Sequence, residues 1–161
     1  MSEERLLRSA SRGNVDALEE LITGLAPELY TYLHGMLGDE YSAAEALEEV
    51  CVRLARSLDR YDRESGVTGW AVQVARRVAA DAAPEVPPPG PWDRETSGED
   101  WARRSLLSLS VADRELVVCR ELLDWDVETI AANCALTPDE VSRRLAAARD
   151  AMFRGGVGAP G

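Results

Sequence analysis

Arginines gather on one predicted helix near the C-terminus, directly after a strong helix-start signal. The segment Thr137-Pro138-Asp139-Glu140 combines an N-cap threonine, proline at the first helical position and glutamate three residues after the cap. The apolar residues that follow share one face of the predicted helix, which leaves Ser142, Arg143, Arg144 and Arg149 for the outer face. Guanidinium groups on such a helix can contact bases and phosphates in the major groove of DNA.

The rest of the sequence offers no catalytic or metal-binding constellation. We find no nucleophile–base pair and no phosphate-binding loop, and the adjacent Glu48 and Glu49 fit a solvated helix face better than a catalytic pair. The only histidine is His34, and the cysteines are odd in number and form no CxxC motif. We therefore expect no enzyme activity, cofactor or metal site. We expect Cys51, Cys119 and Cys134 to be small buried apolar residues in a reducing cytoplasm.

Helical periodicity predicts the elements that position these residues. Apolar side chains recur every three or four residues from Val15 to Met36, and Gly38 follows as a stop signal. A capping box at Ser42-Ala43-Ala44-Glu45 predicts the start of a second helix, and Thr68 can cap a third. No alternating pattern suggests a strand. The sequence therefore predicts an all-α fold.

A proline-rich segment divides this helical pattern. Residues 84–91 read PEVPPPGP and cannot continue a helix. We predict a helical domain over residues 1–83, a linker over 84–104, a helix-turn-helix domain over 105–154 and a flexible tail over 155–161. In the second domain Ser110 can cap one helix, and a short helix near 127–133 precedes the helix that starts at Thr137.

The net charge limits the classes of partner. The chain has 29 acidic and 18 basic residues, the latter all arginine, which gives a net charge of −11. Such a body has little non-specific affinity for nucleic acid. No window approaches about 18 uninterrupted apolar residues, so we expect no membrane contact. The N-terminus MSEERLLRSASRG has no signal-peptide pattern, and we expect a cytoplasmic protein.

The two predicted domains together resemble a bacterial sigma factor of the extracytoplasmic-function (ECF) type. Region 2 of that family resembles the run from Gly13 to Tyr30, the segment SAAEALEEVCVRLARSLDRYDRESG and the segment WAVQVARRVAAD. Region 4 resembles LSVADRELVVCRELLDWDVETIAANCALTPDEVSRRLAAARDAM. The resemblance implies that region 2 binds core RNA polymerase and melts the −10 element, and that region 4 binds the polymerase flap and reads the −35 element.

The resemblance also implies roles for particular positions. The residues implied for polymerase binding are Glu45, Glu48, Glu49 and Arg53. Those implied for the −10 element, including a loop that would capture a flipped base, are Tyr61, Asp62, Arg63, Ser65, Trp70, Arg76 and Arg77. Those implied for the −35 element are Thr137, Glu140, Ser142, Arg143, Arg144 and Arg149. An anti-sigma factor would be a further partner, besides core RNA polymerase and promoter DNA.

Departures from the family pattern keep two other functions open. Ala82-Ala83-Pro84-Glu85 stand where the family usually has an aromatic or leucine residue and then arginines, and Asp139 and Glu140 would repel phosphate. Neither predicted domain is net basic. One alternative is therefore a sigma-like regulator that binds polymerase or an anti-sigma partner without reading a promoter. The other is an ordinary helix-turn-helix regulator.

Overall fold

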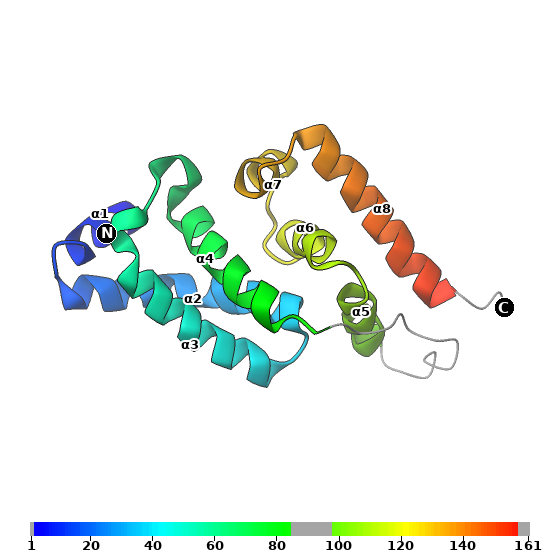
Figure 1. Cartoon of the computed structure of the whole chain (residues 1–161), viewed down its shortest axis with the longest axis horizontal. Coiled ribbons are helices and arrows are strands. Elements are labelled where there is room, and N and C mark those ends of the chain that lie inside the picture. The colour runs from blue at the N-terminus through cyan, green and yellow to red at the C-terminus, as the bar shows by residue number, and fades with distance from the viewer. Residues whose placement is uncertain (1, 85–97, 158–161) are drawn as a thin grey trace.

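The computed structural model describes residues 2–84 and 98–157, and these residues form helices and contain no strand. Four α-helices and two short 3-10 turns come from the first half of the chain, and four α-helices come from the second half (Figure 1). The elements are α1 (Glu3–Ala10), α2 (Val15–Leu37), α3 (Glu40–Arg56), η1 (Leu58–Arg60), η2 (Arg63–Ser65), α4 (Gly66–Ala82), α5 (Gly98–Leu107), α6 (Val111–Glu121), α7 (Val127–Cys134) and α8 (Pro138–Val157). The all-α prediction is confirmed for the described residues.

The long helix α2 organises the first half. Its N-terminus is capped by the side chain of Asn14, which accepts a hydrogen bond from the backbone N–H of Ala17 at 3.1 Å. Gly38 ends it in the left-handed conformation with φ 86°, where its N–H donates to the carbonyl of His34. Most of the predicted apolar stripe faces α1, α3 and α4. The exception is Val15, whose side chain is 72% exposed.

Two predicted caps in the first half are wrong. Helix α3 begins at Glu40, because the side chain of Asp39 accepts a hydrogen bond from the Ser42 N–H at 2.8 Å. Ser42 therefore lies in the first turn of α3 and does not cap it. Helix α4 likewise begins at Gly66, before Thr68, so Thr68 does not cap it.

The second half confirms its predicted caps. The side chains of Ser110 and Thr137 each accept a backbone hydrogen bond at 3.2 Å, the first from Asp113 and the second from Glu140. Ala135 turns the chain between α7 and α8 with φ 55°, which gives the predicted helix-turn-helix. Helix α5 begins at Gly98, inside the range predicted as linker, and α8 continues to Val157, beyond the predicted start of the tail. Residues 85–97 and 158–161 lie outside the described part of the chain.

The two halves pack against each other, and one apolar core includes side chains from both. Gly35 of α2 allows the approach, because an added Cβ would stand 2.8 Å from Leu122 and 2.9 Å from Val118 of α6. Arg114 of α6 is 1% exposed and donates to the carbonyls of Met36 at 2.8 Å and Leu107 at 2.7 Å. These carbonyls belong to the C-terminal turns of α2 and α5, whose partial negative charge stabilises a buried guanidinium.

Candidate functional site

The four residues predicted to bind polymerase lie together on α3. Glu45, Glu48 and Glu49 are exposed, and their spacing of three and four residues keeps them on one side of the helix. Arg53 follows one turn later, and its Nε donates to Glu49 Oε1 at 2.6 Å. The exposed side chain of Val52 adds apolar area to this acidic face. We call Glu45, Glu48, Glu49, Val52 and Arg53 the α3 face.

The residues predicted for the −10 element divide into two groups. Tyr61 packs edge-on against Trp70 with ring centroids 5.8 Å apart, and Asp62 and Arg63 are exposed on the connecting turns. Ser65 is tied to α4, because its hydroxyl accepts a hydrogen bond from Gln73 Nε2 at 3.0 Å.

Arg76 and Arg77 point to different surroundings. Arg77 is exposed on the same side of α4 as Trp70, whereas Arg76 points into the contact between the two halves. The sequence-based assignment therefore gave one role to two neighbouring arginines that the fold places in different surroundings.

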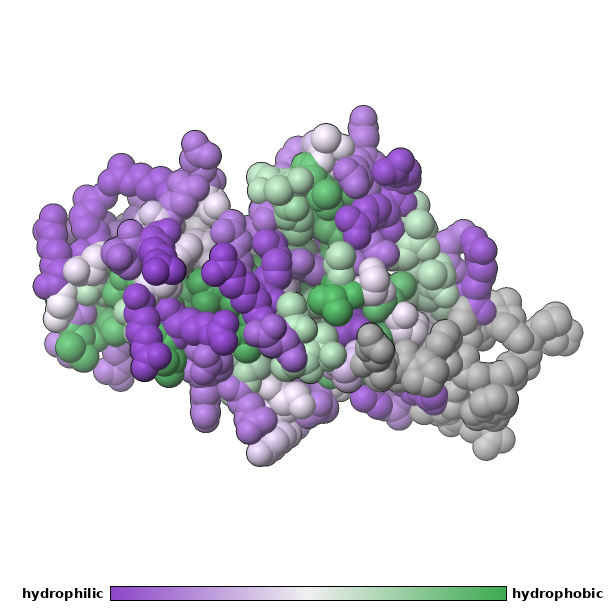
Figure 2. Space-filling view, in the orientation of Figure 1, coloured by the Kyte–Doolittle hydropathy of each residue, from purple (hydrophilic) through white to green (hydrophobic). Residues whose placement is uncertain are grey.

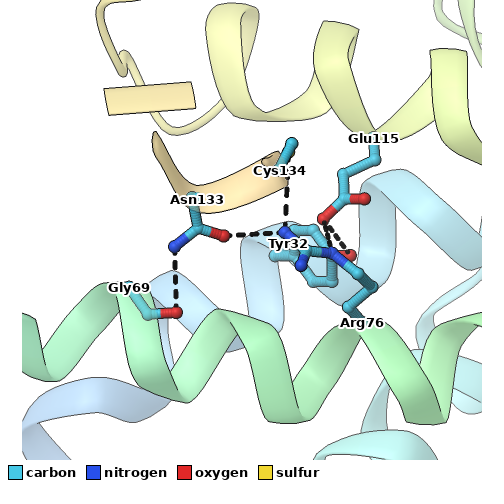
Figure 3. Close-up of polar contacts among 6 residues, drawn as sticks. All are labelled: Tyr32, Gly69, Arg76, Glu115, Asn133 and Cys134. Carbon is cyan, nitrogen blue, oxygen red and sulfur yellow. Dashed lines mark hydrogen bonds and ion pairs between the residues drawn. The ribbon is translucent and has the colours of Figure 1, made fainter. Parts of the chain in front are cut away.

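Arg76 is the centre of a polar cluster that joins α2, α4, α6 and α7 (Figure 3). Its guanidinium donates to Glu115 Oε1 at 2.6 Å and to Asn133 Oδ1 at 2.7 Å. Tyr32 donates its hydroxyl to the same Glu115 oxygen at 3.1 Å. The side-chain amide of Asn133 also donates through Nδ2 to the carbonyl of Gly69 at 3.1 Å. Sequence reasoning missed these partners, because nothing local links residue 76 to residues 115 and 133.

The pKa values in this cluster follow from burial and from the Glu115 carboxylate. Burial alone would lower the pKa of Arg76, but the charge of Glu115 and its hydrogen bond raise it overall. Burial, followed by the negative charge of Glu115, raises the pKa of Tyr32. The same two causes raise the pKa of Cys134 to about 11. Cys134 is therefore a protonated thiol at neutral pH, and its Sγ accepts a weak hydrogen bond from Arg76 at 3.5 Å.

The helix predicted to meet the −35 element carries some of its arginines in ion pairs. Arg144 donates through Nε and Nη2 to Asp113 Oδ1 at 2.9 and 2.7 Å, and Arg149 pairs with Glu121. Arg143 is exposed and has no recorded partner among residues 2–84 and 98–157. Ser142 is exposed beside it.

A hollow of about 410 Å³ between α3 and α4 was not foreseen as a site. Four arginines line it: Arg53, Arg56, Arg60 and Arg77. Two of them, Arg56 and Arg60, were assigned no role from the sequence. The available signal was the repeated arginine at spacings of three and four across the end of α3 and η1. Figure 2 shows hydrophilic side chains over much of the α3 and α4 face that it presents.

The described ranges contain neither a candidate metal centre nor a helix suited to a membrane. Within residues 2–84 and 98–157, no group of three or more His, Cys, Asp and Glu side chains is arranged to hold a metal ion. Across the same ranges, no helix has both the length and the apolar character needed to cross a bilayer.

Comparison with known proteins finds a similarity to RNA polymerase sigma factors. The family model for sigma-70 region 2 matches residues 21–83, the part that holds most of α2, all of α3 and α4. The ECF RNA polymerase sigma factor SigC of Mycobacterium tuberculosis and the probable RNA polymerase sigma-C factor of Mycobacterium bovis are each 28% identical over 165 residues, covering 92% of this chain and 88% of the relative. Residues 21–83 therefore match sigma-70 region 2, and the chain is similar over most of its length to sigma factors of the ECF type.

Two solved complexes contain a chain with the same fold as this one. CnrH in complex with the cytosolic domain of CnrY has a TM-score of 0.74 at 17% identity, over 94% of both chains. The sigma factor RpoE in complex with the anti-sigma factor NepR from Bartonella quintana has a TM-score of 0.65 at 15% identity, over 88% of this chain and 97% of that one. The likeness extends over both halves of the present structure.

Proposed function

We propose that this chain is a sigma factor that binds core RNA polymerase and directs transcription initiation at −10 and −35 promoter elements. The observation that carries the proposal is the α3 face, which lies inside the residues that match sigma-70 region 2. Its glutamates are exposed; Glu49 forms an ion pair with Arg53, and Glu45 accepts a hydrogen bond from the Tyr41 hydroxyl at 3.4 Å. An exposed acidic stripe with an apolar residue in it suits a partly basic helical partner. The proposed place of action is the cytoplasm, where the polymerase works.

In this proposal promoter DNA meets two surfaces. The side of α4 that bears the exposed Arg77 and the largely buried Trp70 faces the −10 element, and α8 faces the −35 element through Arg143 and Ser142. The supporting feature is the α7–α8 helix-turn-helix, whose second helix is capped by Thr137. The proposed domains remain residues 1–83 and 105–154, with the linker at 84–104 between them.

One observation favours a second function. Arg76 is held by Glu115 and Arg144 by Asp113, so two arginines expected at DNA are engaged within the chain. A chain that kept these pairs in its complexes would act as a protein-binding regulator, contacting polymerase or an anti-sigma partner without reading a promoter. The RpoE structure is a complex with the anti-sigma factor NepR, and the CnrH structure is a complex with the cytosolic domain of CnrY.

Run-off transcription with purified core polymerase separates the two functions. We expect the chain to support specific initiation on at least some members of a promoter library. Binding to core without initiation on any promoter would favour the protein-binding regulator.

Charge reversal tests the α3 face directly. The double variant Glu45→Arg/Glu49→Arg should weaken co-purification with core at least about 30-fold, because truncating a buried charged partner at an interface costs about 2 kcal/mol or more. The matched control is Glu19→Arg/Glu20→Arg, which reverses two exposed glutamates on α2. Circular dichroism checks that both variants keep their helices. Equal binding by the two variants would contradict the assignment.

A further inference from the structure

A small hollow lies at the junction between the two halves, beside the Arg76 cluster. It is bounded by α4, by the first half of α6, and by α8 with the turn that precedes it. Its volume is about 150 Å³. We call it the junction hollow. Its lining combines three charged side chains with an apolar wall: Arg76, Glu115 and Arg144, and Ala112, Leu116 and Leu136.

Three polar atoms of these charged side chains keep unused hydrogen-bonding capacity. Arg76 and Arg144 each donate through Nε and Nη2, so the Nη1 atom of each has no recorded partner within residues 2–84 and 98–157. Glu115 accepts both of its recorded hydrogen bonds at Oε1, which leaves Oε2 available (Figure 3). In the same ranges the only buried side-chain polar atom recorded without a partner is Ser105 Oγ, so all three atoms remain accessible to solvent.

The size of the junction hollow favours a compact ligand. Its volume of about 150 Å³ is below the usual range of sites for larger organic ligands, about 300–1,000 Å³. It exceeds the share of about 30 Å³ that one water molecule has in the liquid. The apolar wall offers no donor or acceptor, and it lowers the local dielectric constant, which strengthens hydrogen bonds made by the charged side chains. A tetrahedral oxyanion therefore fits this hollow better than a nucleotide does.

The charges around the junction hollow select among oxyanions. The two guanidinium groups can donate to oxyanion oxygens, whereas Glu115 Oε2 can only accept. Glu115 already balances the charge of Arg76, and Asp113 balances that of Arg144, so net charge alone does not draw an anion into the hollow. Phosphate keeps a P–OH group at neutral pH and can donate it to Glu115. Sulfate has no proton to donate, and the Glu115 carboxylate repels it.

We infer that the junction hollow binds inorganic phosphate. Nη1 of Arg76 and Nη1 of Arg144 donate to its oxygens, and its hydroxyl donates to Glu115 Oε2. The ion bridges α4 of the first half to α6 and α8 of the second half. Because the hollow exists only while the halves are packed, phosphate stabilises the packed arrangement by mass action. The inference goes beyond the proposed function and does not depend on it, since neither polymerase nor a promoter takes part.

Isothermal titration calorimetry of the full chain with sodium phosphate, and separately with sodium sulfate at the same ionic strength, tests the inference. We expect one phosphate per chain, bound at least about 10-fold more tightly than sulfate, because one hydrogen bond to a charged group is enough for such a factor. Arg144→Gln should weaken phosphate binding by at least about 10-fold for the same reason. The matched control is Arg154→Gln, which removes another ion-paired arginine of α8 away from the hollow and should leave the affinity unchanged.

The variant Glu115→Gln separates recognition of the ion from folding. Its side-chain amide is uncharged and can donate to an oxyanion oxygen, so sulfate should now bind at least as tightly as phosphate. A purely structural role of Glu115 would instead weaken the binding of both anions equally. The inference is also overturned if the unaltered chain binds no phosphate, if it binds sulfate equally well, or if Arg144→Gln and Arg154→Gln behave alike. Tighter binding of ATP than of phosphate would contradict the size limit of the hollow.

Discussion

Arg76 illustrates how a single arginine can hold several elements of this chain together. Its guanidinium meets a carboxylate, an amide oxygen and a thiol, which come from α6 and α7. Burying a charge is costly unless it is paired and hydrogen-bonded, and Glu115 is in turn hydrogen-bonded by Tyr32. The cluster is therefore stable only while all its members are present, and removing one leaves the others unpaired.

Glu115→Ala should lower the free energy of unfolding by about 2–3 kcal/mol. Breaking a buried ion pair costs about 3–5 kcal/mol, and Arg76 recovers part of that because 30% of its side chain is exposed. The control is Glu121→Ala on the same helix, which removes a half-exposed partner of Arg149 and should cost at most about 1 kcal/mol. Urea unfolding followed by circular dichroism measures both. Similar losses for the two variants would show that the Arg76 cluster contributes no more than a surface pair.

At the scale of helices, the sequence predicts features that depend on neighbouring residues alone, such as caps and exposed faces. Ser110 and Thr137 cap the predicted helices because no competing acceptor precedes them. Ser42 was a wrong choice because Asp39, three residues earlier, offers a carboxylate to the same helix terminus. Exposure of the α3 face also follows from helical spacing alone. Helix α1 was not predicted, although Leu6, Leu7 and Ala10 share one buried face, because a helix of eight residues is too short to be stable by itself.

Contacts between helices far apart in the sequence could not be predicted in this way. The partners of Arg76 and Arg144 lie 39 and 31 residues away. Their pairing depends on how α6 packs against its neighbours, and no local pattern encodes that packing. For the same reason the sequence did not show that Arg56 and Arg60 converge with Arg77 on one hollow.

The two glycines within α2 should respond in opposite ways to substitution by alanine. Gly35→Ala places a methyl group under 3.0 Å from Val118 and Leu122, so we expect the free energy of unfolding to fall by about 1–2 kcal/mol. Gly24→Ala meets nothing within 4 Å and should raise it by about 0.5–1 kcal/mol through helix propensity. Thermal and urea unfolding of both variants provide the measurement. If Gly35→Ala instead raised the free energy of unfolding, α2 and α6 would be able to move apart at little cost and so accommodate the methyl group.

The whole molecule has one shared apolar core, although its sequence predicts two domains. Buried residues from α1 to α8 belong to a single cluster, and α2 contacts both α5 and α6. Polar contacts reinforce the junction, including the bond from the Trp125 indole N–H to Glu28 at 3.1 Å. A proline-rich sequence between two helical patterns therefore does not by itself determine whether the patterns pack together.

Because the core is shared, the chain should unfold in one cooperative transition. We expect the urea midpoints from circular dichroism at 222 nm and from tryptophan fluorescence to coincide. Of the four tryptophans, Trp125 lies at the junction between the halves and Trp70 lies in the core of the first half, so the fluorescence reports on both. Two separated transitions would instead show that the halves are thermodynamically independent.

The distance in sequence between Arg76 and Glu115 also has a consequence in time. A ribosome adds about 5–20 residues per second, so the 39 residues that separate this pair take about 2–8 s to make. The helices α1 to α4 contact one another extensively and can form during that interval, whereas Arg76 stays hydrated until α6 has been synthesised. Every new molecule therefore passes through a period of seconds in which Arg76 has been made and its partner Glu115 has not.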